Sequence, residues 1–120
     1  MASLLIVEDE LEVADSLKDY FSLHGVEVFI ANTGEQGLEI LAEKKPSVVL
    51  LDMKLGSGIS GLEFLRKAKA AKSTAQIIVV TAVDDQNVST MARGFGAADY
   101  MTKPLTIPDV ERVVLSRLKK

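Results

Sequence analysis

Acidic, hydroxyl and amino side chains follow several apolar runs of the sequence, close to the point where each run ends. In chain order these residues are Glu8, Asp9, Asp52, Thr81 and Lys103. If the runs are parallel strands of one sheet, their carboxyl ends meet at the edge where such sheets bind ligands. Three crowded carboxylates repel one another, and a hard divalent cation with oxygen ligands, commonly Mg²⁺ inside cells, relieves that repulsion. The pattern therefore predicts a magnesium site.

The remaining groups of this set suit phosphoryl transfer. Magnesium that keeps several waters and few protein oxygens is typical of sites where phosphate oxygens fill the other positions. The ammonium of Lys103 and the hydroxyl of Thr81 can each bind a different phosphoryl oxygen. A central carboxylate could act as the nucleophile and form an aspartyl phosphate.

The elements that must position these groups alternate between two patterns. Short apolar runs rich in β-branched residues predict strands at 4–7, 26–30, 48–51, 77–80 and, more weakly, 97–101. Amphipathic stretches predict helices at 11–21, from 33 to before Pro46, at 61–71, at 85–95 and from 106 onward. Three of the runs are apolar at successive positions, which indicates a parallel sheet covered on both faces. We predict a doubly wound α/β fold of five β-α units in one domain, residues 1–120.

Local signals define several helix ends. Thr33 with Gln36 three residues later is a capping-box pattern, and Thr106 is an expected N-cap. His24, close to a helix end, is interpreted as structural, and Glu10 as a helix-start charge.

Composition excludes several classes of function. Of the 120 residues, 48% are hydrophobic and 26% charged, which is typical of a globular domain, and the net charge of −3 argues against direct nucleic-acid binding. The absence of cysteine excludes disulfides and Cys-based metal sites and favours a cytoplasmic protein. We expect neither export nor membrane insertion, because no signal-like or membrane-length apolar run is present.

The residues that carry chemistry, taken with their neighbours, resemble the receiver domain of two-component response regulators. The matching segments are LIVEDE at 5–10, VVLLD at 48–52, VVTA at 79–82 and GAADYMTKP at 96–104. Each is weak alone, but their order and spacing are specific, and the resemblance covers essentially all 120 residues. It implies a flavodoxin-like parallel sheet with strand order 2-1-3-4-5.

The resemblance also implies a role for each matching residue. Asp52 would be the phosphoacceptor, Thr81 and Lys103 would bind the phosphoryl group, and Tyr100 would be an aromatic switch that follows Thr81. A cis peptide is expected before Pro104.

For the metal, the resemblance implies Mg²⁺ held by Glu8, Asp9, Asp52 and the backbone carbonyl of Lys54. The chain departs from the family in the segment 55–61, which is one residue longer than usual and lacks a proline, so we expect a mobile loop. Val83 offers nothing to orient an attacking water. Together these departures favour a long-lived phosphoryl state.

By resemblance, the function is to accept a phosphoryl group from a histidine kinase or a histidine phosphotransfer protein. The switched surface would be the face of the fourth helix, fifth strand and fifth helix, which would contact an output domain or protein and could support a phosphorylation-dependent homodimer. The chain would be no turnover enzyme, and it could be a stand-alone receiver or part of a longer regulator. Two alternatives stay open: a phosphate-independent protein-binding module, and an Mg²⁺-dependent phosphatase with an aspartyl nucleophile.

Overall fold

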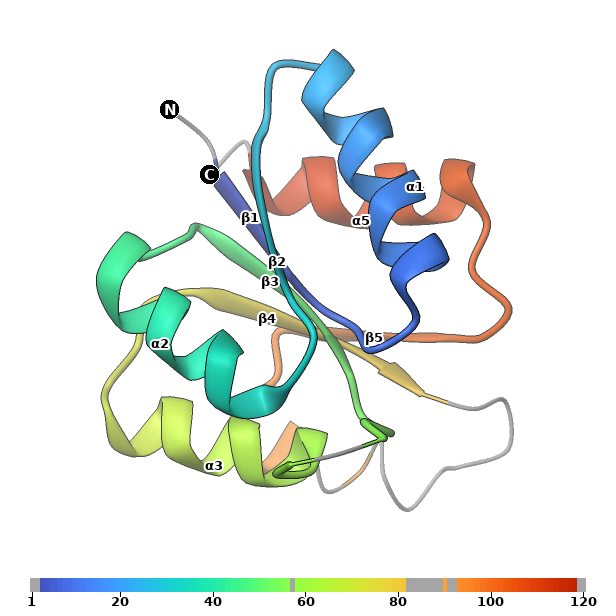
Figure 1. Ribbon diagram of the computed structural model, residues 1–120. Coiled ribbons are helices and arrows are strands. Elements are labelled where there is room, and N and C mark those ends of the chain that lie inside the picture. Colours follow the sequence, from blue (N-terminus) through green and yellow to red (C-terminus); the bar gives the residue numbers. More distant parts are fainter. Residues whose placement is uncertain (1–2, 57, 82–89, 91–92, 119–120) are drawn as a thin grey trace.

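The computed structural model describes residues 3–56, 58–81, 90 and 93–118. Its five strands are β1 (Ser3–Val7), β2 (Glu27–Ala31), β3 (Val48–Asp52), β4 (Gln76–Thr81) and β5 (Asp99–Thr102). They form one sheet in the order β2-β1-β3-β4-β5, and every pair is parallel (Figure 1). The predicted fold class and strand order are confirmed.

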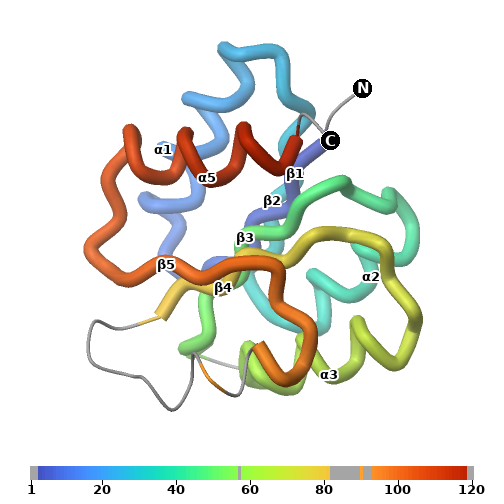
Figure 2. Tube along the Cα trace, turned by 180° about the vertical axis from the view of Figure 1, so that it is seen from behind, coloured from blue at the N-terminus to red at the C-terminus, as the bar shows by residue number. Residues whose placement is uncertain are grey.

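Within the described part of the chain, four helices lie on the two faces of this sheet: α1 (Leu11–Leu23), α2 (Gly34–Lys44), α3 (Gly61–Ala70) and α5 (Ile107–Leu118). Figures 1 and 2 show α1 and α5 on one face and α2 and α3 on the other. Right-handed crossovers between parallel strands produce this arrangement. The fourth helix predicted at 85–95 falls mostly outside the described residues, as does Val83.

Successive residues of the central strands supply two separate cores. Leu4 and Ile6 of β1 pack on the α1–α5 side with Phe21, whereas Leu5 and Val7 pack on the α2–α3 side with Phe64. Every residue of β1 and β3 is buried. The runs of uninterrupted apolar residues therefore reflect a strand with both faces covered, as predicted.

Two strands, β2 and β5, begin later than predicted. Val26 was expected to open the second strand, but its N–H donates to the carbonyl of Phe21 in the turn that ends α1, and Gly25 there has φ +78°. β2 accordingly begins at Glu27. β5 begins at Asp99, two residues later than predicted, after a turn in which Gly96 has φ +93°.

The predicted helix caps are present, with one change of partner. Thr33 Oγ1 accepts the N–H of Gln36 at 3.1 Å, but Gln36 Oε1 accepts from Asn32 instead of Thr33. Thr106 accepts from the N–H of Asp109 at 3.4 Å. His24 Nδ1 lies 2.9 Å from the carbonyl oxygen of Tyr20 and its ring stacks on that tyrosine, in line with a structural role.

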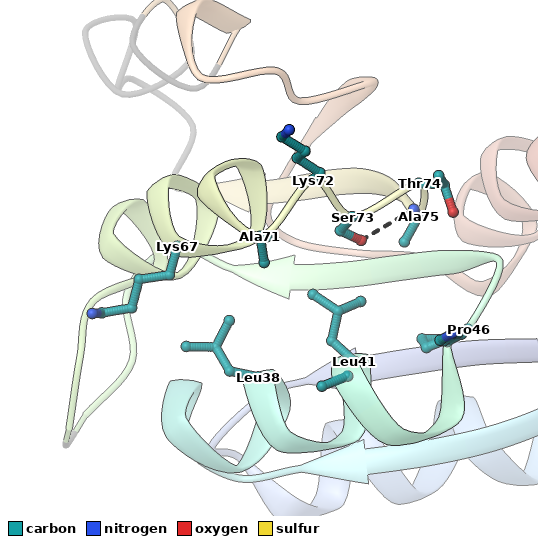
Figure 3. Close-up of a pocket in the computed structure, with 12 residues that line it drawn as sticks. Leu38, Leu41, Pro46, Lys67, Ala71, Lys72, Ser73, Thr74 and Ala75 are labelled. Atoms are coloured by element: carbon teal, nitrogen blue, oxygen red, sulfur yellow. Dashed lines mark hydrogen bonds between the residues drawn. The ribbon is translucent and has the colours of Figure 1, made fainter.

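A cavity of about 700 Å³ opens between the carboxyl ends of α2 and α3 (Figure 3). Leu38, Leu41 and Ala71 face it, whereas the side chains of Lys67 and Lys72 extend away from it. The rest of its lining comes from Ala42 of α2, Ala68 of α3 and the segments that precede β3 and β4. The cavity therefore lies at the amino edge of the sheet, opposite the strand ends that carry the predicted site. Among the described residues, no helix has the length and apolar character needed to cross a membrane.

Candidate functional site

Three carboxylates meet at the carboxyl edge of the sheet, as the sequence predicts. Glu8 and Asp9 directly follow β1, and Asp52 is the last residue of β3. One oxygen from each carboxylate can be chosen so that all three lie within 4.8 Å of one another. The parallel pairing of β1 with β3 brings these groups together, because it places their carboxyl ends side by side.

Asp52 is the most enclosed of the groups expected to do chemistry, with 3% of its surface exposed. Its Oδ1 accepts the backbone N–H of Lys54 at 3.0 Å, and its Oδ2 accepts a hydrogen bond from Lys103 Nζ at 3.1 Å. A buried carboxylate is costly unless it is paired, and here a backbone donor and an ammonium supply the pairing.

Glu8 is similarly buried, with 4% of its surface exposed. Several effects together raise the pKa of Glu8 from 4.5 to about 7. Burial is the largest cause; the hydrogen bond to Asp52 and the charge of Asp52 also raise this pKa, whereas the Glu10 N–H and the charge of Lys103 lower it. The hydrogen bond from the Glu10 N–H to Oε2 measures 3.2 Å. The metal-free site thus holds a proton on Glu8 more readily than an exposed glutamate would, which lessens the repulsion among the carboxylates.

Asp9 is more exposed than the other two acids, and its carboxylate accepts a hydrogen bond from a residue far away in the sequence. Its Oδ2 accepts the N–H of Gly56 at 2.8 Å. A Cβ built on Gly56 would lie 2.5 Å from that oxygen, so a larger residue there would displace the Asp9 carboxylate. This partner was missed by sequence reasoning, although the glycines of the 55–61 segment were a signal that backbone approaches something closely there.

Lys103 reaches the carboxylates from the segment that follows β5. Its partial burial alone would lower its pKa, but the hydrogen bond to Asp52 and the charges of Asp52, Glu8 and Glu10 raise that pKa overall. Lys103 Nζ also lies 3.9 Å from Glu10 Oε1. Glu10, interpreted from the sequence as a helix-start charge, therefore faces the site as well. The Lys103–Pro104 peptide is cis, as expected.

Thr81 and Tyr100 lie on neighbouring strands near this edge. Thr81 ends β4 with 6% of its surface exposed, and its carbonyl accepts the N–H of Lys103 at 2.9 Å. Tyr100 is half-buried against the α2–α3 side of the sheet, and the guanidinium of Arg93 lies 4.8 Å from its ring centroid. The structure places both residues, but their predicted roles remain predictions.

The described groups fit a bound Mg²⁺. Glu8, Asp9 and Asp52 offer carboxylate oxygens, the ligand type that Mg²⁺ prefers, at a spacing that one ion can span. The ammonium of Lys103 donates to Asp52 Oδ2, whereas Asp52 Oδ1 accepts from the backbone N–H of Lys54, so Oδ1 is the oxygen without an ammonium partner.

A family model described as the response regulator receiver domain matches residues 4–115. The chain belongs to this family. Among curated proteins, it is 31% identical over 111 residues to sporulation initiation phosphotransferase F of Bacillus subtilis, covering 92% of this chain and 89% of that one. It is 35% identical to the KDP operon transcriptional regulatory protein KdpE of Escherichia coli, with 98% of this chain covered, and it spans about half (52%) of KdpE.

Solved receiver domains have the same architecture. A CheY-like response regulator receiver domain protein from Methanospirillum hungatei superposes with a TM-score of 0.92 at 29% identity, covering 99% of this chain and 94% of the other. The BeF3-activated N-terminal receiver domain of RstA from Klebsiella pneumoniae gives a TM-score of 0.88 at 25% identity, covering 98% and 99%. Receiver domains act with histidine kinases and with output domains, and this chain has the fold on which they do so.

Proposed function

We propose that this receiver domain accepts a phosphoryl group on Asp52, with Mg²⁺ bound by Glu8, Asp9, Asp52 and the backbone carbonyl of Lys54. One observation supports this most strongly: the buried Asp52 carboxylate lies between an ammonium and two further carboxylates. A carboxylate nucleophile beside a cation and an oxygen-ligand metal site is the arrangement that phosphoryl transfer needs.

The donor would be a phosphohistidine of a histidine kinase or of a histidine phosphotransfer protein. A carboxylate oxygen of Asp52 forms a bond to phosphorus while the P–N bond of the donor breaks, and the electron pair of that bond returns to the imidazole nitrogen. Mg²⁺, when bound, neutralises charge on the phosphoryl oxygens. Hydrolysis later breaks the P–O bond and regenerates Asp52, so the chemistry is performed by the domain on itself and the chain is no turnover enzyme.

Lys103 and Thr81 would bind the transferred phosphoryl group through their ammonium and hydroxyl. Lys103 is already joined to β4 by its N–H bond to the Thr81 carbonyl, so a movement at the site reaches β5 by a short path. Tyr100, on β5, would follow Thr81 and change the surface that includes β5 and α5, where an output domain, a partner protein or a second copy would bind. The names of two relatives support a role in phosphoryl transfer and regulation: one is a phosphotransferase and the other a transcriptional regulatory protein.

Labelling at Asp52 tests the proposal. Incubation with Mg²⁺ and acetyl phosphate is expected to raise the intact mass by one phosphoryl group. Asp52→Asn is expected to abolish this addition because the carboxylate nucleophile is replaced by an amide. Glu63→Gln, which neutralises an acid on α3 paired with Arg66 at the surface, is the matched control and should label normally. Labelling that persists in Asp52→Asn would remove Asp52 from its role. Absence of both labelling and Mg²⁺ binding in the wild type would instead favour a phosphate-independent binding module.

A further inference from the structure

The loop between β3 and α3 holds two carboxylates of the candidate site with its backbone. The N–H of Lys54 donates to Asp52 Oδ1 at 3.0 Å, and the N–H of Gly56 donates to Asp9 Oδ2 at 2.8 Å. Charged acceptors make the stronger hydrogen bonds of proteins, so these contacts orient the two side chains. Where this loop lies therefore decides where two of the proposed metal ligands point.

The far end of the same loop is docked on the first turn of α2. The N–H of Ile59 donates to both carboxylate oxygens of Glu35, at 3.2 and 3.1 Å. The Ile59 side chain packs on Gly34 so closely that a Cβ built on that glycine would lie 2.4 Å from Ile59 Cγ1. A backbone hydrogen bond to Glu35 and an apolar contact with Gly34 thus fix the loop on α2 at Ile59, three positions after Gly56.

Gly58 completes this docking. Its φ is +73°, and a Cβ added to it would lie 2.2 Å from Glu35 Oε1. The left-handed conformation favours glycine, and any Cβ at this position would displace the Glu35 carboxylate. Two of the three glycines of the 55–61 segment thus lie close to carboxylates, Gly56 to Asp9 and Gly58 to Glu35.

An acid in the first turn of a helix often only complements the helix dipole. Here α2 already has a cap, because Thr33 accepts the Gln36 N–H and Gln36 in turn accepts the Asn32 N–H. Both oxygens of Glu35 are directed instead at the Ile59 N–H, 24 residues away along the chain. A dipole role alone does not account for this direction.

We propose that Glu35 is a positioning residue of the phosphorylation site, which holds the β3–α3 loop so that Gly56 and Lys54 can orient Asp9 and Asp52. The inference rests on the proposed function. It explains how a loop that is longer than usual and lacks proline can still present its backbone to the metal ligands. Groups that orient metal ligands influence metal affinity without touching the ion.

The test compares Glu35→Ala and Glu35→Gln with Glu39→Ala. Glu39 is an exposed acid one turn further along α2, and among the described residues it accepts no hydrogen bond, so its replacement removes the same charge without the docking contact. Mg²⁺ affinity, measured by titration of amide chemical shifts, is expected to fall about tenfold in Glu35→Ala. It should fall less in Glu35→Gln, whose amide oxygen can still accept from Ile59, and stay within about twofold in Glu39→Ala.

A second measurement needs no metal. In metal-free protein, hydrogen exchange at the Gly56 amide is expected to quicken in Glu35→Ala and to stay at the wild-type rate in Glu39→Ala, because only the first releases the loop. If the wild type binds Mg²⁺ but Glu35→Ala keeps the wild-type affinity, the positioning role is overturned and the proposed function stands. If the wild type itself fails to bind Mg²⁺, the proposed function fails first, and the inference fails with it.

Discussion

The burial of individual site residues does not follow from their residue types alone. Residue order predicts that Glu8, Asp9, Asp52 and Lys103 converge, because each stands at a strand end. It does not predict that Glu8 is as buried as Asp52 while Asp9 remains nearer to solvent. Burial depends on the packing around each group, so the sequence alone does not reveal which of several acids is enclosed.

The raised pKa of Glu8 predicts a pH-dependent stability. Its pKa is about 7 in the native state, where burial is the main cause, against 4.5 without those interactions. Between these values the native state binds more protons than the unfolded state, so stability falls as pH rises. Protonation of Glu8 contributes roughly 3 kcal/mol to the free energy of unfolding. This contribution is complete below pH 4.5 and is lost as the pH rises through about 7.

Urea unfolding in EDTA at pH 5 and pH 8 measures this effect. Glu8→Gln keeps the shape and cannot ionise, so its free energy of unfolding should decline less between the two pH values than that of the wild type. Asp9, Glu10, Asp52 and Lys103 are present in both proteins, which leaves the difference to Glu8. Equal pH dependence in the two proteins would contradict the raised pKa.

At the scale of elements, the hydrophobic pattern predicts strands and buried helix faces, but it does not predict individual contacts between distant residues. Uninterrupted apolar runs predicted β1, β3 and β4, and the stripe of Leu11, Ala14, Leu17 and Phe21 predicted the buried face of α1. The prediction is wrong for Leu11, which opens the helix and is 59% exposed. Contacts such as Gly56 with Asp9 join residues 47 positions apart. No periodicity encodes them, because they depend on how a loop lies once the sheet and helices are assembled.

Gly37 gives an element-scale prediction in which two effects oppose each other. In the middle of α2, replacing glycine by alanine should stabilise the helix by up to about 1 kcal/mol from propensity alone. A Cβ there would, however, lie 2.9 Å from Phe64 Cε2 on α3 and 3.0 Å from Val7 Cγ2 on β1. Overpacking in a filled core costs about 1–3 kcal/mol.

We therefore expect Gly37→Ala to lower the free energy of unfolding by roughly 1 kcal/mol. Glu39→Ala, an exposed position of the same helix, should leave it almost unchanged and serves as the control. A more stable Gly37→Ala protein in urea unfolding would mean that α2 can move away from the sheet without cost.

For the whole molecule, the question is how a change at one edge of the sheet reaches a partner surface. The fold places the proposed phosphorylation site at the carboxyl ends of β1 and β3, and β4 separates it from β5. Lys103, which follows β5, contacts both β3 and β4: its ammonium donates to Asp52, and its N–H donates to the Thr81 carbonyl. The proposed switch would therefore use one side chain and one backbone hydrogen bond, both of Lys103.

Lys103→Ala should separate phosphorylation from signalling. The variant keeps Asp52 and the carboxylates expected to bind Mg²⁺, so acetyl phosphate should still label it, though more slowly because an ammonium that binds phosphoryl oxygens is gone. Beryllofluoride is expected to shift the amide resonances of Thr81, Tyr100 and α5 in the wild type and to leave them nearly unshifted in Lys103→Ala. Lys54→Ala removes a cation from an exposed side chain next to the site and retains the backbone carbonyl, so it should respond like the wild type. If Lys103→Ala showed the full set of shifts, the coupling would have to run through Thr81 alone, and the salt bridge between Lys103 and Asp52 would serve only to neutralise a buried charge.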